Sequence, residues 1–435
     1  MLSLLTSPLL PASFLLLMAI GGRFLSGSWL STGSFAALLW CVFVWVSILS
    51  TDYPIYASAV WVIVLLVFSL QAGAFIGESM VGGKRKRPDC HGLEFAGAAN
   101  RLLGFSILFS IIASVGAIYF VFWTFSRFDL PASPLSLLGL GHLWSVQRYE
   151  YGELEPWPVR LTVMWVYPAA LLGGIAYASA IDRKARWYCL LPFLPSLLVG
   201  TIVAARAGIL IAAIIWSSGY FAVKHWRSSG THVLFRRRLV LFLVVLGIAG
   251  IALFMSIDAI RQSSDGQTFN VLLDSQRLFK YAFGSLAAFS NWFHGSISHD
   301  LGFGAYTFGG IFDVLRIKHR EIGLYEGMVT LPGGEETNIY TAIRGLIQDF
   351  TLAGALILVF SASLVSGALL SSSWRGTSMS VLFASAYYAF ILCSPLTSIF
   401  TYNGVVLAWL VGAVVLSSHA RIAAVKPKFV ADPTT

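Results

Sequence analysis

Charged residues are scarce in this sequence. Only 11% of its 435 residues are Asp, Glu, Lys or Arg, whereas 57% are hydrophobic and the mean hydropathy is +0.77. Soluble globular domains carry about 25% charged residues, so this class is excluded. The apolar segments are continuous rather than alternating, which argues against a β-barrel. The composition therefore predicts an all-α polytopic membrane protein.

Motifs for nucleotide or metal chemistry are also lacking. The chain has no Walker P-loop, no H-E-x-x-H, no C-x-x-C and no Asp-x-Asp, and its four cysteines are scattered. The Gly-rich stretch 302–310 lacks the spacing and the strand-to-helix setting of a dinucleotide site. We therefore expect no cofactor, no metal site and no ATP hydrolysis. The net charge of +9 comes from basic residues in short loops beside apolar spans, a pattern of membrane topology rather than of nucleic-acid binding.

A membrane span needs about twenty mostly apolar residues. By this criterion we predict about eleven transmembrane helices. They lie near residues 5–22, 33–51, 55–77, 100–124, 161–181, 187–204, 207–223, 239–257, 350–370, 378–397 and 403–418.

Basic residues in the short loops set the orientation. Under this list of spans they all fall on one side, which the positive-inside rule makes the cytoplasm. The basic segments are 84–87, 183–186, 224–238, Arg375 and 421–428. The chain then divides into helices 1–8 (1–257, with a smaller periplasmic loop at 125–160), a large periplasmic loop (258–349), helices 9–11 (350–418) and a cytoplasmic tail (419–435).

The 258–349 loop is the one long polar interruption, and it holds ten of the chain's twenty acidic residues. If residues 338–370 form one helix entering the membrane, then Thr337, Tyr340, Thr341, Arg344 and Gln348 share one stripe. A polar stripe that runs into a span indicates a lined cavity. The alternative is that Arg344 pairs with one of the loop's acids, while Glu335 and Glu336 cap the helix.

Other cations on the predicted outer side point to an anionic ligand. Arg206 stands in a tight turn at membrane depth, where a cation is costly without an anionic partner or water. Snorkelling to lipid headgroups is the alternative. Arg277 and Lys280 share a helical face, and such clusters suit phosphate, although a solvated surface explains them almost as well. The features together predict a metal-independent group transfer on an amphipathic anion outside the cytoplasm.

Three stretches resemble the bacterial oligosaccharide repeat-unit polymerases, the Wzy or O-antigen polymerase family. Residues 337–344 (TNIYTAIR), followed by Gln348-Asp349-Phe350, are similar to the family's T-N-x-Y-T-x-x-R…D-F-G junction. Thr351 replaces the usual Gly, a difference that we treat as minor. Residues 281–289, which begin at Tyr281, resemble the loop segment before the Gly-rich patch, and 205–208 resemble the S-R-x-G turn with Ala205 in place of Ser.

The resemblance implies an inverting, GT-C-type glycosyltransferase of the bacterial inner membrane with its active site facing the periplasm. Donor and acceptor would both be glycans linked to undecaprenyl pyrophosphate in the lipid bilayer, and a chain-length regulator protein is a possible partner. Pyrophosphate and glycan would be bound by residues that match the motifs or lie beside them: Arg206, Arg344, Arg277, Lys280, Asn338, Tyr340 and Tyr281. The general base would be Asp349, Glu336 or His294. An O-antigen ligase and a lipid-linked glycan transporter or flippase are the alternatives.

Overall fold

In a computed structural model the chain is an all-helical membrane protein with one short β-hairpin. The structure describes residues 7–81, 92–131, 140–141, 143–144, 146–147, 151–152, 154–179, 182, 184–203, 207–227, 275–295, 301–318, 325, 329–331, 335–371 and 378–425. The predicted span 239–257 and Arg206 lie outside these residues.

The elements follow one another along the chain in this order. They are α2 (Leu9–Ser26), α3 (Thr32–Ser50), α4 (Ala57–Met80), α5 (Gly92–Arg127), α7 (Trp157–Val163), α8 (Val166–Ala178), α9 (Ala185–Tyr188), α10 (Phe193–Ile202), α11 (Ala207–Arg227), α14 (Ser275–Gly295), α15 (Gly309–Val314), β1 (Val329–Leu331), β2 (Glu335–Thr337), α16 (Ala342–Ser371), α17 (Ser378–Cys393), the 3₁₀ turn η2 (Ile399–Thr401) and α18 (Asn403–Val425).

Within the described residues, eight helical segments are long and apolar enough to cross a membrane, and two further apolar helices are shorter. The eight are Leu9–Ser26, Thr32–Ser50, Ala57–Met80, Ala99–Arg127, Trp157–Ala178, Ala185–Ile202, Ala207–Trp226 and Ala342–Leu370. The two shorter helices are Met379–Cys393 and Asn403–Ser418. A polytopic helical membrane protein is therefore confirmed, with boundaries a few residues from the predicted ones.

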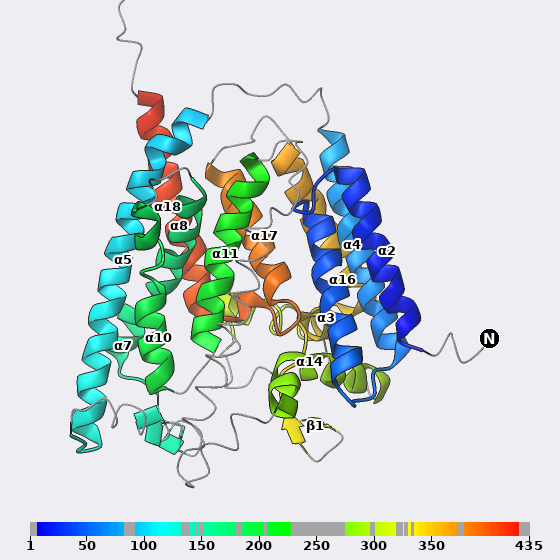
Figure 1. Ribbon diagram of the computed structural model, residues 1–435, viewed down its shortest axis with the longest axis horizontal. Helices are drawn as coiled ribbons and strands as arrows, with labels where there is room; N and C mark the ends of the chain where they lie inside the picture. Colours follow the sequence, from blue (N-terminus) through cyan, green and yellow to red (C-terminus); the bar gives the residue numbers. More distant parts are fainter. Residues whose placement is uncertain are drawn as a thin grey trace, which may run out of the picture.

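The helices form two groups (Figure 1). α2, α3, α4 and α16 pack together on one side, and α5, α7, α8, α10, α11 and α18 on the other, with α17 between them. Glycines permit the closest approaches within the first group. A Cβ on Gly73 or Gly77 of α4 would collide with the backbone of α16, and one on Gly367 of α16 would collide with α4. Such close backbone packing is typical of helices associating in lipid, where dispersion replaces the hydrophobic drive.

α14 and β1 lie at one end of this bundle (Figure 1). Two hydrogen bonds hold α14 there: the amide of Tyr56, just before α4, donates to Ser290 Oγ at 2.8 Å, and Ser285 Oγ donates to the carbonyl of Pro395 at 2.8 Å. β1 and β2 pair antiparallel, Val329 opposite Thr337. The bundle thus carries a cap at the end where α16 begins.

The single helix expected over residues 338–370 is wrong in two places. Glu335–Thr337 form strand β2, so Glu335 and Glu336 do not lie at a helix N-terminus, and α16 begins only at Ala342. Within α16 the backbone of Thr351 is non-helical, with φ 63° and ψ 172°. The turns that carry Arg344 and Gln348 are therefore a separate helical segment. A sharp backbone break at Thr351 divides this segment from the rest of α16.

Candidate functional site

Arg344 lies in the first turn of α16 and is almost fully buried, at 7% exposure. Its guanidinium carbon is 3.8 Å from the ring centre of Tyr340, 4.1 Å from that of Tyr325 and 5.2 Å from that of Trp292. Nε donates to Gln348 Oε1 at 3.4 Å, one helical turn further on. Aromatic faces attract a cation, so three rings stabilise this charge in its largely buried position.

Three buried polar atoms around this turn have no hydrogen-bond partner in the described part of the chain: Arg344 Nη1, Thr341 Oγ1 and Thr307 Oγ1. Thr341 immediately precedes α16, and Thr307 Oγ1 is 3.6 Å from the position of a Cβ on Gly345. Nor does any described carboxylate form an ion pair with Arg344. Native proteins rarely leave buried donors unsatisfied, because each costs about 1–3 kcal/mol. The arrangement suits an oxygen-rich anion.

Asp349, one of the predicted general bases, is buried and bonded to the backbone of the Gly-rich loop. It is 1% exposed, and its two oxygens accept the backbone N–H groups of Tyr306 (3.1 Å) and Thr307 (2.6 Å). A third bond, from Gly302 N to the carbonyl of Gln348 at 3.0 Å, ties the same loop to α16. Asp349 therefore clamps the Gly-rich loop over the Arg344 turn.

The Gly-rich stretch, which lacked any motif, is explained by this clamp. A Cβ on Gly302 would collide with Asp349, and Gly304 has a φ of 99°, which side chains disfavour. Ser398 Oγ, from the turn between α17 and α18, holds the loop from its other side by donating to the carbonyl of Thr307 at 2.7 Å. The glycines permit close packing against α16 rather than phosphate binding by a dinucleotide fold.

Tyr325 is a component of the site that the sequence analysis missed. Its ring stacks in parallel on Tyr306, with centres 5.3 Å apart and an angle of 7°, and meets Tyr340 edge-on. Trp292 of α14, which also contacts the Arg344 guanidinium, is a second such component. A contact between residues this far apart in sequence leaves no periodic signal, so no pattern could have found either ring.

The other predicted residues have varied positions. His294 is exposed at the end of α14 and stacks on Tyr56 at 3.9 Å, and Asn338 is half-buried just before Tyr340. Arg277, Lys280 and Tyr281 lie on α14, as their helical spacing predicts, and Glu336 lies on β2. The side chains of these four residues, like Arg206, are outside the described part of the structure. Of the predicted set, direct contact therefore joins Arg344 with Tyr340, and His294 contacts a different aromatic ring.

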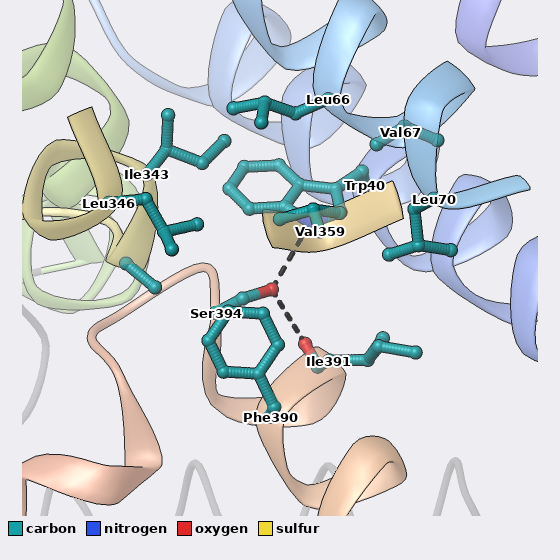
Figure 2. Close-up of a pocket in the computed structure, with 11 residues that line it drawn as sticks. Trp40, Leu66, Val67, Leu70, Ile343, Leu346, Val359, Phe390, Ile391 and Ser394 are labelled. Atoms are coloured by element: carbon teal, nitrogen blue, oxygen red, sulfur yellow. Dashed lines mark hydrogen bonds between the residues drawn. The ribbon is translucent and has the colours of Figure 1, made fainter. Parts of the chain in front are cut away.

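The opposite face of the same turns of α16 is apolar. Ile343 and Leu346 line a small pocket together with Trp40 of α3 and Phe390 of α17 (Figure 2). Its polar group, the Ser394 hydroxyl, accepts a hydrogen bond from Trp40 Nε1 at 3.1 Å and donates to the carbonyl of Ile391 at 2.7 Å. The pocket has no free polar group to orient a ligand, and it anchors α16 to its neighbours.

Within the described residues no group of three His, Cys, Asp or Glu side chains could hold a metal ion. Comparison with known proteins adds no assignment: no family model, no curated protein and no solved structure matches the chain. Function must therefore be inferred from the site itself.

Proposed function

We propose that this protein is a bacterial inner-membrane polymerase that joins oligosaccharide repeat units carried on undecaprenyl pyrophosphate. One observation carries the proposal: a buried arginine with an unpaired N–H lies among unpaired hydroxyls at the end of a membrane-spanning helix. Such a site fits the phosphate of an amphipathic lipid whose tail stays in the bilayer. The family resemblance of residues 337–350, which include Arg344, selects the glycan-bearing diphosphate among such lipids.

In the proposed reaction an acceptor hydroxyl oxygen attacks the anomeric carbon of the donor's reducing-end sugar. A new glycosidic bond forms with inversion, the bond between this carbon and the diphosphate oxygen breaks, and undecaprenyl pyrophosphate leaves with the bonding electrons. Arg344 offsets the negative charge that grows on the leaving group. We assign Arg206, Arg277 and Lys280 to the same diphosphate, and Asn338, Tyr340 and Tyr281 to its surroundings.

The proton of the acceptor hydroxyl needs a base. Both oxygens of Asp349 already accept backbone N–H groups, so we assign this residue to positioning the loop. Glu336 and His294 remain the candidate bases. In this proposal the chain has eleven spans, its basic loops lie in the cytoplasm, and the 258–349 region faces the periplasm, where a chain-length regulator protein would act.

Chain growth in a purified system tests the proposal. Purified protein in lipid is given a lipid-linked repeat unit, and the products are resolved on a gel. We expect a ladder from the wild type, and a loss of rate of about 10²–10³-fold for Arg344→Ala, as for removal of a transition-state donor. Arg344→Lys keeps the charge but loses the planar stacking, so it should recover little. Arg206→Ala should also reduce the ladder.

Arg160→Ala is the matched control, because Arg160 is exposed on α7 and outside the site; its ladder should equal that of the wild type. Unchanged growth in Arg344→Ala would contradict the proposed site, and transfer only to a lipid A-core acceptor would make the protein a ligase.

A transporter is the second candidate, because the backbone is interrupted between α7 and α8, between α9 and α10, and at Thr351. Interrupted helices are typical of transporters, and passage of the lipid across vesicles without chain growth would favour this alternative.

A further inference from the structure

We propose that the Tyr325 hydroxyl donates a hydrogen bond to the anionic group that Arg344 binds. The pairing of Tyr325 with Arg344 on one anion follows from the geometry, whereas the identification of that anion as a lipid diphosphate rests on the proposed function. Tyr325 belongs to no motif in the sequence, and it has no role in the reaction as described above.

The Tyr325 side chain lies close to the Arg344 guanidinium. The Tyr325 ring lies 4.1 Å from the Arg344 guanidinium carbon, and its Oη is 3.0 Å from the place of a Cβ on Gly345. The hydroxyl thus lies over the same turn of α16 as the unpaired Nη1, and the absence of a side chain at residue 345 makes room for it. Two donors from separate segments therefore lie close enough to share one phosphate group.

Among the described residues, none forms a hydrogen bond with the Tyr325 hydroxyl. Tyr325 is 7% exposed, yet in the described part of the chain it makes ring contacts and no hydrogen bond. Its hydroxyl is therefore available to donate to a ligand. Around the Cβ position of Gly345 it lies close to Thr307 Oγ1, which is one of the buried polar atoms without a partner within the described residues.

The Tyr325 ring is held in place, and its hydroxyl keeps its proton. Parallel stacking on Tyr306 and the edge-on contact with Tyr340 limit its rotation, so the donor is preorganised. Burial raises the pKa of the Tyr325 phenol, an effect that outweighs the opposing influence of Arg344. At neutral pH the group is therefore a hydroxyl that can donate, and it adds no negative charge to repel an anion.

Binding of undecaprenyl pyrophosphate to the full-length protein in lipid nanodiscs tests this inference. Loss of one hydrogen bond to a charged group weakens binding by about 10- to 100-fold, which is the expected effect of Tyr325→Phe. Binding of undecaprenol, which lacks phosphate, should be the same for the variant and the wild type. Tyr56→Phe is the matched control, because Tyr56 stacks on His294 rather than on Arg344. The thermal midpoint and elution profile of each variant establish that it is folded.

The outcomes separate this inference from the proposed function. Wild-type affinity in Tyr325→Phe, or an equal loss in Tyr56→Phe, overturns the role of Tyr325. Equal losses for undecaprenol overturn it too, because the hydroxyl would then act on the tail or on the fold. A specific loss of diphosphate affinity without any chain growth by the wild type supports Tyr325 and refutes the polymerase. If the wild type does not bind the diphosphate, neither idea survives.

Discussion

At the scale of single residues, Thr351 has a backbone conformation that side chains disfavour. Its φ of 63° and ψ of 172° place it in a region that glycine alone occupies readily, and its side chain is β-branched. Glycine is the residue that this backbone favours, and it is also the residue that the sequence analysis expects here from the motif. Thr351 Oγ1 accepts from Gly354 N at 3.4 Å, which offsets only a small part of the cost.

We therefore expect Thr351→Gly to stabilise the protein. Relief of the strain, about 1–3 kcal/mol, exceeds the few tenths of a kcal/mol lost with the weak cap. The free energy of unfolding in denaturant, measured in detergent, gives the size of the effect. Thr351→Ala removes the same hydroxyl but keeps the Cβ, so it should give no gain. Equal stability of the Gly and Ala variants would mean that residue 351 is not strained.

At the scale of elements, the contact between α4 and α16 determines where the site lies, because α16 carries Arg344. A Cβ on Gly77 would collide with the carbonyl of Leu364. We expect Gly77→Leu to force the helices apart, to cost about 1–3 kcal/mol of stability and to reduce chain growth together with it. Thermal unfolding and the gel assay measure the two effects.

Gly104→Leu is the control for this change. Gly104 is exposed on α5 and nothing lies within 4 Å of its Cβ position, so the bulk is added without a clash. The same loss of stability in both variants would point to a general intolerance of leucine at helical glycines rather than to the packing of α4 on α16.

Sequence periodicity predicts the described helices well and their internal breaks poorly. Hydropathy identifies α16 because its apolar run is long. The same run continues through Thr351, so the side-chain pattern gives no sign of the backbone break there. The Pro residues that precede α7 and α10 are visible signals for helix starts. The interruption at Met164 has a signal too, because Pro168 has no N–H to donate to the Met164 carbonyl. Element type therefore follows from composition, whereas the break at Thr351 carries no such signal.

Part of the candidate site is predictable from the sequence, because a charged residue stands out in an apolar pattern. Arg344 can be identified from the sequence because a cation beside an apolar span is energetically costly and is therefore a candidate for a functional role. Tyr325, Trp292 and the clamp on Asp349 depend on contacts between distant segments, and a single sequence carries no signal for them. The charged residue of the site can thus be predicted from the sequence, whereas the aromatic rings and backbone groups that contact the site can be identified only from the folded structure.

At the scale of the whole molecule, the two ends of the helix bundle differ: the basic segments follow helices at one end, and the cap lies at the other. The ends of α4, α11 and α18 that lead into basic segments lie at one end of the bundle, and α14 and β1 lie at the other (Figure 1). Basic loops remain in the cytoplasm because translocating them is costly. The Arg344 site should consequently face the periplasm.

Labelling of single cysteines from outside the cell checks this orientation. Lys318→Cys follows α15 at the capped end and Lys184→Cys precedes α9 in a basic loop, and both positions are exposed. Cys41, Cys189 and Cys393 are buried, so replacing Cys90 by Ser gives a silent background. A membrane-impermeant maleimide should label Lys318→Cys in intact spheroplasts, and Lys184→Cys only after permeabilisation. The reverse pattern would place the Arg344 site in the cytoplasm, where a periplasmic polymerase could not act, and the proposed function would fall with the topology.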